Sequence, residues 1–220
     1  NILIIKPSSL GDVVRCLPIL AALRQHYLQA RISWLVRPDC AEILAHIPEL
    51  DEIIEFNRKK YGKIGISVSV LRDFVDFICH LHRKKFDLIL DLQGLFRSGF
   101  LAFASGAPIR IGFANARELA PLFYTHRIQI PQTREHVVLS NWRFMDYLGI
   151  GQLENRYPLP VDPASAQSAQ LILQQNGLNP DRPYIVMLIG GSDRRKRWPA
   201  KSFTDLAQSL QMKYDMQSIL

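Results

Sequence analysis

The feature that most constrains the fold is the alternation of short apolar runs with longer amphipathic segments. The apolar runs predict strands at residues 2–6, 32–36, 53–56, 87–92, 110–113, 127–130 and 184–189. The amphipathic segments predict helices at residues 12–28, 39–45, 68–85, 96–104, 135–148, 164–176 and 200–213. Several strands are apolar on both faces, as in a parallel sheet covered by helices on both sides. The order favours a doubly wound α/β fold with right-handed crossovers.

The proline-rich stretch at residues 149–183 predicts a domain boundary, because dense prolines restrict regular structure. We expect a Rossmann-like domain at residues 1–160 and a linker with one helix at 161–183. Residues 184–220 then begin a second Rossmann-like domain. Asn1 in place of an initiator methionine, and the strand-like run at 216–220, read as the ends of a piece of a longer protein.

The net charge of +7 favours an anionic partner, either a phosphorylated ligand or an anionic membrane face, although a solvated basic surface is the simpler alternative. Nucleic acid is not expected, because no zinc-finger, RNP-type or helix-turn-helix pattern accompanies the charge. The three cysteines and six histidines show no metal-ligand spacing, so no metal and no cofactor are predicted. No run of about 18 apolar residues and no secretory leader is present, which favours a cytoplasmic protein.

The first candidate site is the loop at residues 6–12, between the first strand and the first helix. Ligands of open α/β sheets bind at the carboxyl ends of strands. Gly11 permits close approach of a ligand to the backbone, and Asp12 can serve as a general base for a hydroxyl. The spacing of Ser9 and Asp12 also matches a capping box, which is the commoner reason for this pattern at a helix start. The required glycines and lysine of nucleotide-binding loops are absent.

The second candidate site is the strand–turn–helix segment at residues 91–99. Gln93 and Arg97 can bind oxygen atoms of an anionic ligand, since a guanidinium donates two parallel hydrogen bonds to carboxylate or phosphate. A tight turn followed by a surface arginine is an equally good interpretation of the residues alone.

Two further segments are basic. Residues 57–63 form a predicted loop in which Arg58, Lys59 and Lys60 can hold phosphates or lipid headgroups. Residues 190–199 follow a predicted buried strand, and small residues such as Gly191 let backbone N–H groups approach phosphates that the following cations neutralise, although a solvated charged loop is the alternative. The basic residues at 82–85 instead complement a helix dipole. Among the histidines, only His136, at the start of a helix, is kept as a possible ligand contact.

Four segments, in order, resemble glycosyltransferase family 9 of the lipopolysaccharide heptosyltransferase I type. They are residues 4–13, residues 91–98, the pair 116–118 and 122–124, and residues 196–199. The resemblance implies a GT-B architecture and an inverting, metal-independent transfer of heptose from ADP-heptose to the Kdo-lipid A inner core. It further implies an enzyme in peripheral contact with the cytoplasmic face of the inner membrane.

The resemblance also assigns roles by matched position. Asp12 is the implied catalytic base, and Lys196 binds the donor phosphates with Ser192 nearby. Arg58, Lys59, Lys60, Arg97 and Arg117 are the implied contacts of the anionic acceptor. The other predicted acceptor-binding residues are Ser9, Gly11, Gln93 and His136. A chain with only the start of the donor domain is expected to be inactive alone. Alternatives are a non-catalytic anionic glycolipid-binding module, a family 9 transferase with another sugar or acceptor, and a nucleotide-binding enzyme of another class.

Overall fold

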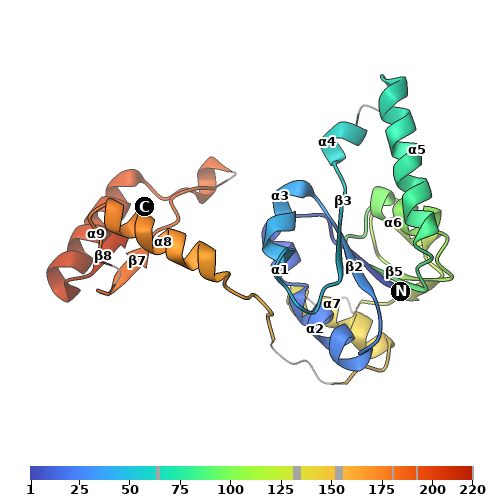
Figure 1. Ribbon diagram of the computed structural model, residues 1–220, viewed down its shortest axis with the longest axis horizontal. Helices are drawn as coiled ribbons and strands as arrows, with labels where there is room; N and C mark the ends of the chain where they lie inside the picture. Colours follow the sequence, from blue (N-terminus) through green and yellow to red (C-terminus); the bar gives the residue numbers. More distant parts are fainter. Residues whose placement is uncertain (63–64, 131–134, 152–155, 180, 192, 220) are drawn as a thin grey trace. The chain divides into compact units, whose positions relative to one another are not determined.

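The computed structural model describes residues 1–220 except 63–64, 131–134, 152–155, 180, 192 and 220 (Figure 1). The chain divides into two compact units, Asn1–Pro160 and Val161–Leu220, which are described separately. The helix predicted within a linker groups with the second unit. Within the described residues, no helix is both long enough and apolar enough to cross a bilayer.

The first unit is built on a six-stranded parallel sheet in the order β3-β2-β1-β4-β5-β6. Its strands are β1 (Ile2–Ile5), β2 (Ile32–Val36), β3 (Glu52–Glu55), β4 (Leu88–Asp91), β5 (Ile109–Phe113) and β6 (His126–Ile128). The direction in which strands are added reverses between β1 and β4, where Ile5 lies opposite Asp91. The predicted doubly wound α/β fold is therefore confirmed, and the reversal marks the edge at which such sheets bind ligands.

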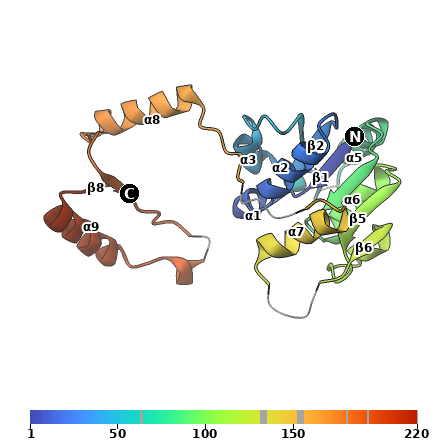
Figure 2. The same ribbon diagram turned by 90° about the horizontal axis from the view of Figure 1, so that it is seen from below.

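Helices cover both faces of this sheet (Figures 1 and 2). One face carries α1 (Leu10–Val14), α2 (Leu17–His26), α3 (Pro38–Ala41), η1 (Glu42–Leu44) and α7 (Val137–Tyr147), and the other carries α4 (Arg58–Tyr61), α5 (Val68–Arg83) and α6 (Phe96–Ala104). The 3-10 turn η2 (Ala120–Phe123) packs on α6. Successive β1 residues point to opposite cores, Ile4 to the first and Ile5 to the second. Because successive residues face different cores, the residues on both sides of the strand are apolar.

The structure corrects several predicted boundaries. The single helix predicted at 12–28 is two helices, because Pro18 lies in the first turn of α2 and has no N–H to donate to the preceding turn. The helix predicted at 39–45 ends as the 3-10 turn η1. The basic segment predicted as a loop begins with the helix α4, which Asn57 caps by accepting a hydrogen bond from the Lys60 amide at 3.0 Å.

The second unit contains α8 (Pro163–Gln175), β7 (Tyr184–Val186), η3 (Arg194–Lys196), α9 (Ala200–Tyr214) and β8 (Gln217–Ile219). β7 and β8 pair in parallel across α9, as in one β–α–β unit. The strand predicted at 184–189 spans only Tyr184–Val186, and it is largely exposed rather than buried, with Tyr184 and Val186 45% and 55% exposed.

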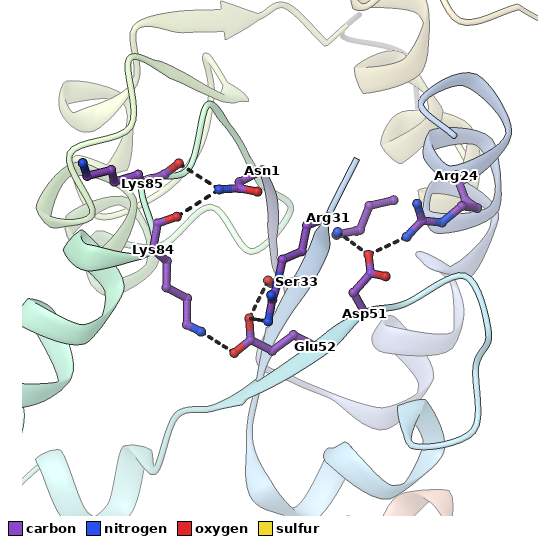
Figure 3. A network of polar contacts seen from close by, with 9 residues as sticks. Asn1, Arg24, Arg31, Ser33, Asp51, Glu52, Lys84 and Lys85 are labelled. Atoms are coloured by element: carbon purple, nitrogen blue, oxygen red, sulfur yellow. Dashed lines mark hydrogen bonds and ion pairs between the residues drawn. The ribbon is translucent and has the colours of Figure 1, made fainter. Parts of the chain in front are cut away.

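The amino-terminal edge of the first sheet is held by a network of paired charges (Figure 3). The carboxylate of Glu52 accepts hydrogen bonds from Lys84 and, at 3.0 Å, from the Ser33 hydroxyl. Asp51 accepts from the Arg24 guanidinium at 2.5 Å and from the Ile32 amide at 2.6 Å. Burial raises the pKa of Glu52, but Lys84 and Ser33 outweigh it and hold that pKa below its usual range. This edge therefore ties β2, β3 and α5 together.

Candidate active site

A pocket opens at the opposite, carboxyl edge of the same sheet, on the side where the strand order reverses. Its lining comes from the segments that follow four strands: β1, β2, β3 and β4. The residues are Pro7, Ser8, Arg37, Phe56, Arg58, Gln93, Leu95, Arg97, Ser98 and Leu101. A second pocket shares Arg37 and Arg58 with it and adds Pro38, Asp39, Asn57 and Lys59. The structure thus brings together Arg58, Gln93 and Arg97, which sequence analysis took from separate segments.

Asp12 lies in the first turn of α1, on the segment that follows the pocket residues Pro7 and Ser8, and does not itself line the pocket. Its Oδ2 accepts hydrogen bonds from the Ser9 amide at 3.2 Å and the Ser9 hydroxyl at 2.9 Å. Its Oδ1 lies 3.2 Å from the Arg15 guanidinium. Partial burial raises the pKa of Asp12, but the Ser9 hydrogen bonds and the charges of Lys6 and Arg15 leave it below its usual value. The capping box is present, and the same carboxylate is ionised at neutral pH.

Lys6 is a buried cation that sequence analysis did not single out. It directly follows β1, and its Nζ donates a hydrogen bond to the Leu92 carbonyl at 3.0 Å. It joins the two loops on either side of the strand-order reversal and places a positive charge near Asp12. Arg37, the residue after β2, was missed as well and lines both pockets. A cation immediately after a buried strand was the available signal in both cases.

The turn that carries Gln93 is built around the fully buried carboxylate of Asp91. Asp91 accepts hydrogen bonds from the Gln93 amide at 3.0 Å, the Gly94 amide at 3.1 Å and the Tyr124 hydroxyl at 2.7 Å. Burial raises the pKa of Asp91 against the effect of these donors. Gly94 has φ +65°, a conformation that other residues rarely adopt. A Cβ on Gly112 would lie 2.2 Å from the Tyr124 ring, so a glycine is required there for Tyr124 to reach Asp91.

Gln93 and Arg97 present different chemistry to the pocket. Among the described residues, the buried Oε1 of Gln93 has no hydrogen-bond partner. Arg97 lies in the first turn of α6, which the Ser98 hydroxyl caps by accepting from the Leu95 amide at 3.0 Å. A hydrogen-bond acceptor between cations suits a ligand that carries hydroxyl and anionic groups together.

The predicted acceptor contacts divide into free and paired cations. In the part of the chain that the structure describes, the side chains of Arg58, Lys59 and Arg97 make no hydrogen bond or ion pair. Lys60 instead forms an ion pair with Asp73 of α5 at 2.7 Å and lines neither pocket. Lys60 therefore links α4 to α5 through this ion pair.

Three other predicted residues lie apart from the pocket lining. Gly11 lies within α1 with open space where a Cβ would be, so its backbone can be approached. Arg117 donates its backbone amide to the Gly94 carbonyl at 3.0 Å, which fixes the loop after β5 to the Gln93 turn. His136 caps α7 by accepting from the Val138 amide at 3.4 Å, and this cap accounts for a histidine at that position.

The basic loop of the second unit, residues 190–199, contains several hydrogen bonds and an ion pair between its own residues. Asp193 pairs with Arg195 at 2.7 Å, and Arg197 donates to the Gly191 carbonyl at 2.8 Å. Lys196 lies on η3, and its Cβ is 3.5 Å from the position of a Cβ on Gly191. Lys196 and Arg194 are left without side-chain partners among the described residues. Ser192, predicted beside them, lies outside the described residues.

Within the described ranges, no cluster of three or more histidine, cysteine or acidic side chains could hold a metal ion. Cys16 is fully buried beneath the Asp12 loop, and burial raises the pKa of its thiol to about 12. Its Sγ accepts a hydrogen bond from Asn141 of α7 at 3.2 Å. This thiol therefore has a packing role at neutral pH.

Open α/β sheets bind ligands where the strand order reverses, and the cations at this position that are unpaired among the described residues suit an anionic ligand. The sequence model of glycosyltransferase family 9 (heptosyltransferase) matches residues 75–217. The chain belongs to this family, as the resemblance predicted.

Similar proteins support the same assignment. The chain is 28% identical to lipopolysaccharide heptosyltransferase 1 of Pseudomonas aeruginosa, over 96% of this chain and 58% of the relative. It is 25% identical to the lipopolysaccharide core heptosyltransferase OpsX of Haemophilus influenzae, over 94% and 56% of the two chains. The chain thus spans less than two thirds of the length of these relatives.

Two solved structures show the fold. The Escherichia coli heptosyltransferase WaaC with ADP-2-deoxy-2-fluoro heptose matches with a TM-score of 0.74 at 27% identity, over 95% of this chain and 65% of that one. A family 9 glycosyltransferase from Veillonella parvula matches with a TM-score of 0.84 at 22% identity, over 99% and 61%. These likenesses confirm the predicted α/β fold of the GT-B type.

Proposed function

We propose that the chain carries the acceptor side of an inverting heptosyltransferase that transfers heptose from ADP-heptose to the Kdo-lipid A inner core. The observation that carries the proposal is the carboxylate of Asp12, which has a lowered pKa and follows Pro7 and Ser8 of a pocket whose lining includes Arg58 and Arg97, cations unpaired within the described part of the chain. Family membership supports the reaction class, and the names of the relatives support the sugar and the lipopolysaccharide acceptor. The WaaC structure with an ADP-heptose analogue supports the donor.

In the proposed reaction, the Asp12 carboxylate takes the proton of the acceptor hydroxyl. The acceptor oxygen forms a bond to the anomeric carbon while the bond from that carbon to the diphosphate breaks, and ADP leaves with the electron pair. A single displacement of this kind inverts the anomeric centre. The Ser9 hydroxyl donates to Asp12 Oδ2 at 2.9 Å, and an acceptor hydroxyl would donate to the same carboxylate before giving up its proton.

The binding roles follow from charge. Arg58, Lys59 and Arg97 would neutralise the carboxylates and phosphates of the acceptor, and the lone acceptor atom of Gln93 would receive one of its hydroxyls. In the second unit, Gly191 and Lys196 would hold the donor diphosphate, with Ser192 as a further contact by the family's pattern. The enzyme would work at the cytoplasmic face of the inner membrane, where its lipid acceptor lies.

The test compares Asp12→Asn and Asp12→Ala with the unchanged sequence, in the complete gene product, using ADP-heptose and Kdo-lipid A. Loss of the base is expected to lower kcat by about 10²–10⁴-fold. Asp12→Asn keeps a side-chain oxygen for the Ser9 amide and controls for the capping role. Similar kcat values for Asp12→Asn and wild type would assign Asp12 to capping alone. Absence of transfer by the wild type with any nucleotide sugar would favour a glycolipid-binding module.

A further inference from the structure

The helix α5 carries more apolar surface than its own domain covers. Phe74, Phe77 and Leu81 lie on the side that packs against the second core. Spaced by three and four residues, they form one stripe along the helix. This stripe attaches the helix to the sheet, with Leu81 buried and Phe74 and Phe77 partly buried.

A second apolar stripe on α5 faces solvent beside the first. Val68, Leu71 and Val75 are 84%, 44% and 49% exposed, and Ile66, just before the helix, is 87% exposed. Their spacing places Val68, Leu71 and Val75 on one side of the helix. Single exposed apolar residues are ordinary, but a contiguous group on one helix marks an interaction surface.

The basic helix α4 is fixed next to this stripe by aromatic packing. Tyr61 lies against Phe74 and Phe77 with ring centroids 5.3 and 5.7 Å away. α4 therefore carries Arg58 and Lys59, free of side-chain partners among the described residues, alongside the start of α5. Lys60 offsets Asp73. Of the remaining charges on this half of α5, Arg72 and Asp76 balance each other, so the excess charge comes from α4.

Both segments lie at the carboxyl edge of the sheet, where the candidate active site is. α4 follows the carboxyl end of β3, and α5 runs back toward the amino end of β4, so α5 begins at the active-site edge. Figure 1 shows α4 and the start of α5 extending together beyond the strands. Exposed apolar side chains and unpaired cations thus occur on one projecting end of the first unit.

We propose that Ile66, Val68, Leu71 and Val75, together with Arg58 and Lys59 of α4, form a docking surface for an anionic bilayer. The inference rests on the proposed function, since a lipid-linked acceptor requires the crevice to face a membrane. Apolar side chains enter the headgroup region while adjacent cations meet lipid phosphates. A protein partner would be expected to offer carboxylates fixed opposite the cations, whereas a bilayer supplies mobile anions at any spacing.

The first experiment measures sedimentation of the 220-residue chain with vesicles of equal parts phosphatidylcholine and phosphatidylglycerol, without any lipid A. We expect binding that weakens with salt. The double variant Val68→Ser with Val75→Ser is expected to bind at least about tenfold more weakly, because each change removes apolar carbons from the lipid. Leu139→Ser on α7, 47% exposed, is the matched control and should bind like the wild type. Equal binding by the double variant, or none by the wild type, would overturn the inference.

A second measurement locates the contact directly. Tryptophan at position 68 (Val68→Trp) should be quenched by brominated phosphatidylcholine in the same vesicles, and Leu139→Trp should not. Unquenched Val68→Trp on bound protein would place the membrane contact elsewhere. A dimer in solution that Val68→Ser dissociates would instead assign the stripe to a second copy of the chain.

Transfer assays with the complete gene product separate this inference from the proposed function. The double variant should lose about tenfold in kcat/KM for an acceptor embedded in vesicles and nothing for a deacylated, water-soluble acceptor. If the double variant has the wild-type kcat/KM for both acceptors, the proposed transfer reaction stands and the proposed docking surface is contradicted. If the wild type binds vesicles but transfers heptose to neither acceptor, the docking surface stands and the proposed function is contradicted.

Discussion

The two edges of the first sheet carry the same kinds of residues in opposite states. At the amino edge, Glu52 and Asp51 meet Lys84 and Arg24, and every one of these charges has a partner. At the carboxyl edge, Arg58 and Arg97 line a pocket without side-chain partners among the described residues. The amino edge uses its charges to hold strands and helices together, whereas the carboxyl edge keeps Arg58 and Arg97 available for a ligand beside the pairs Arg37–Asp39 and Lys60–Asp73. Composition cannot separate these uses, because both edges are basic and polar.

The largest expected effect concerns Asp91, whose carboxylate is fully buried at the carboxyl edge. Asp91→Ala should lower the free energy of unfolding by about 3 kcal/mol, because it leaves the Gln93 and Gly94 amides and the Tyr124 hydroxyl without an acceptor. Urea denaturation of the 220-residue chain measures it. Asp91→Asn, which keeps an oxygen for the two amides, should lose less. Equal losses would show that the negative charge itself, rather than the turn, is what the site needs.

The next effect concerns the free cations. Arg58→Gln combined with Arg97→Gln should weaken binding of the anionic acceptor by about 100-fold, while the free energy of unfolding changes by less than about 0.5 kcal/mol. Titration calorimetry and urea denaturation measure the two quantities. Lys60→Gln, which removes a cation already paired with Asp73, is the matched control and should change affinity little. A loss of about 2 kcal/mol in the unfolding free energy of the double variant, as expected for a paired charge, would show that Arg58 and Arg97 also stabilise the fold.

The amino edge should give the opposite result. Glu52→Gln should lower the free energy of unfolding by about 2 kcal/mol, because Lys84 and Ser33 lose a charged acceptor in a partly buried place. Acceptor affinity should stay unchanged, since this edge lies at the far end of the strands. A weaker acceptor affinity in Glu52→Gln would show that the two edges are coupled through the sheet.

The smallest effect is the pH dependence of that stabilisation. The folded pKa of Glu52 is depressed, so its contribution is fully present above the unfolded pKa of about 4.3. It is lost as the pH falls through the lower folded value. The difference in unfolding free energy between wild type and Glu52→Gln should be constant near neutral pH and shrink below about pH 4. A difference that grows on acidification contradicts the depressed pKa.

Local patterns were enough for much of the fold and part of the site. The apolar runs of β1, β2 and β4 are buried on both faces, so strand type and sheet class follow from residues within each run. The ends of the helices were harder to predict from the sequence. The break at Pro18 and the helix α4 depend on single positions, a proline in a first turn and the cap Asn57, that a periodic pattern averages over.

The candidate site divides along the same line. Asp12, Gln93 and Arg97 were found because each follows a buried strand in a short, polar segment. The sequence could not predict which cations lack an ion-pair partner. Arg58 and Lys60 are two residues apart, but only Lys60 pairs with Asp73 across the α4–α5 contact. Lys6 and Arg37 were passed over because one charge after a strand has no meaning until neighbouring strands are known.

By itself, the sequence determined that the chain makes a parallel α/β sheet, that its ligand-binding loops follow the strands, and that the charge of those loops is positive. These properties follow from periodicity and residue type, which act over a few neighbouring positions. Only the tertiary structure decided the strand order that lets Lys6 reach the Leu92 carbonyl, next to Gln93, and which cations are paired. Pairing depends on side chains that approach within about 4 Å, and residues as distant in sequence as Glu52 and Lys84 meet only when the sheet has formed.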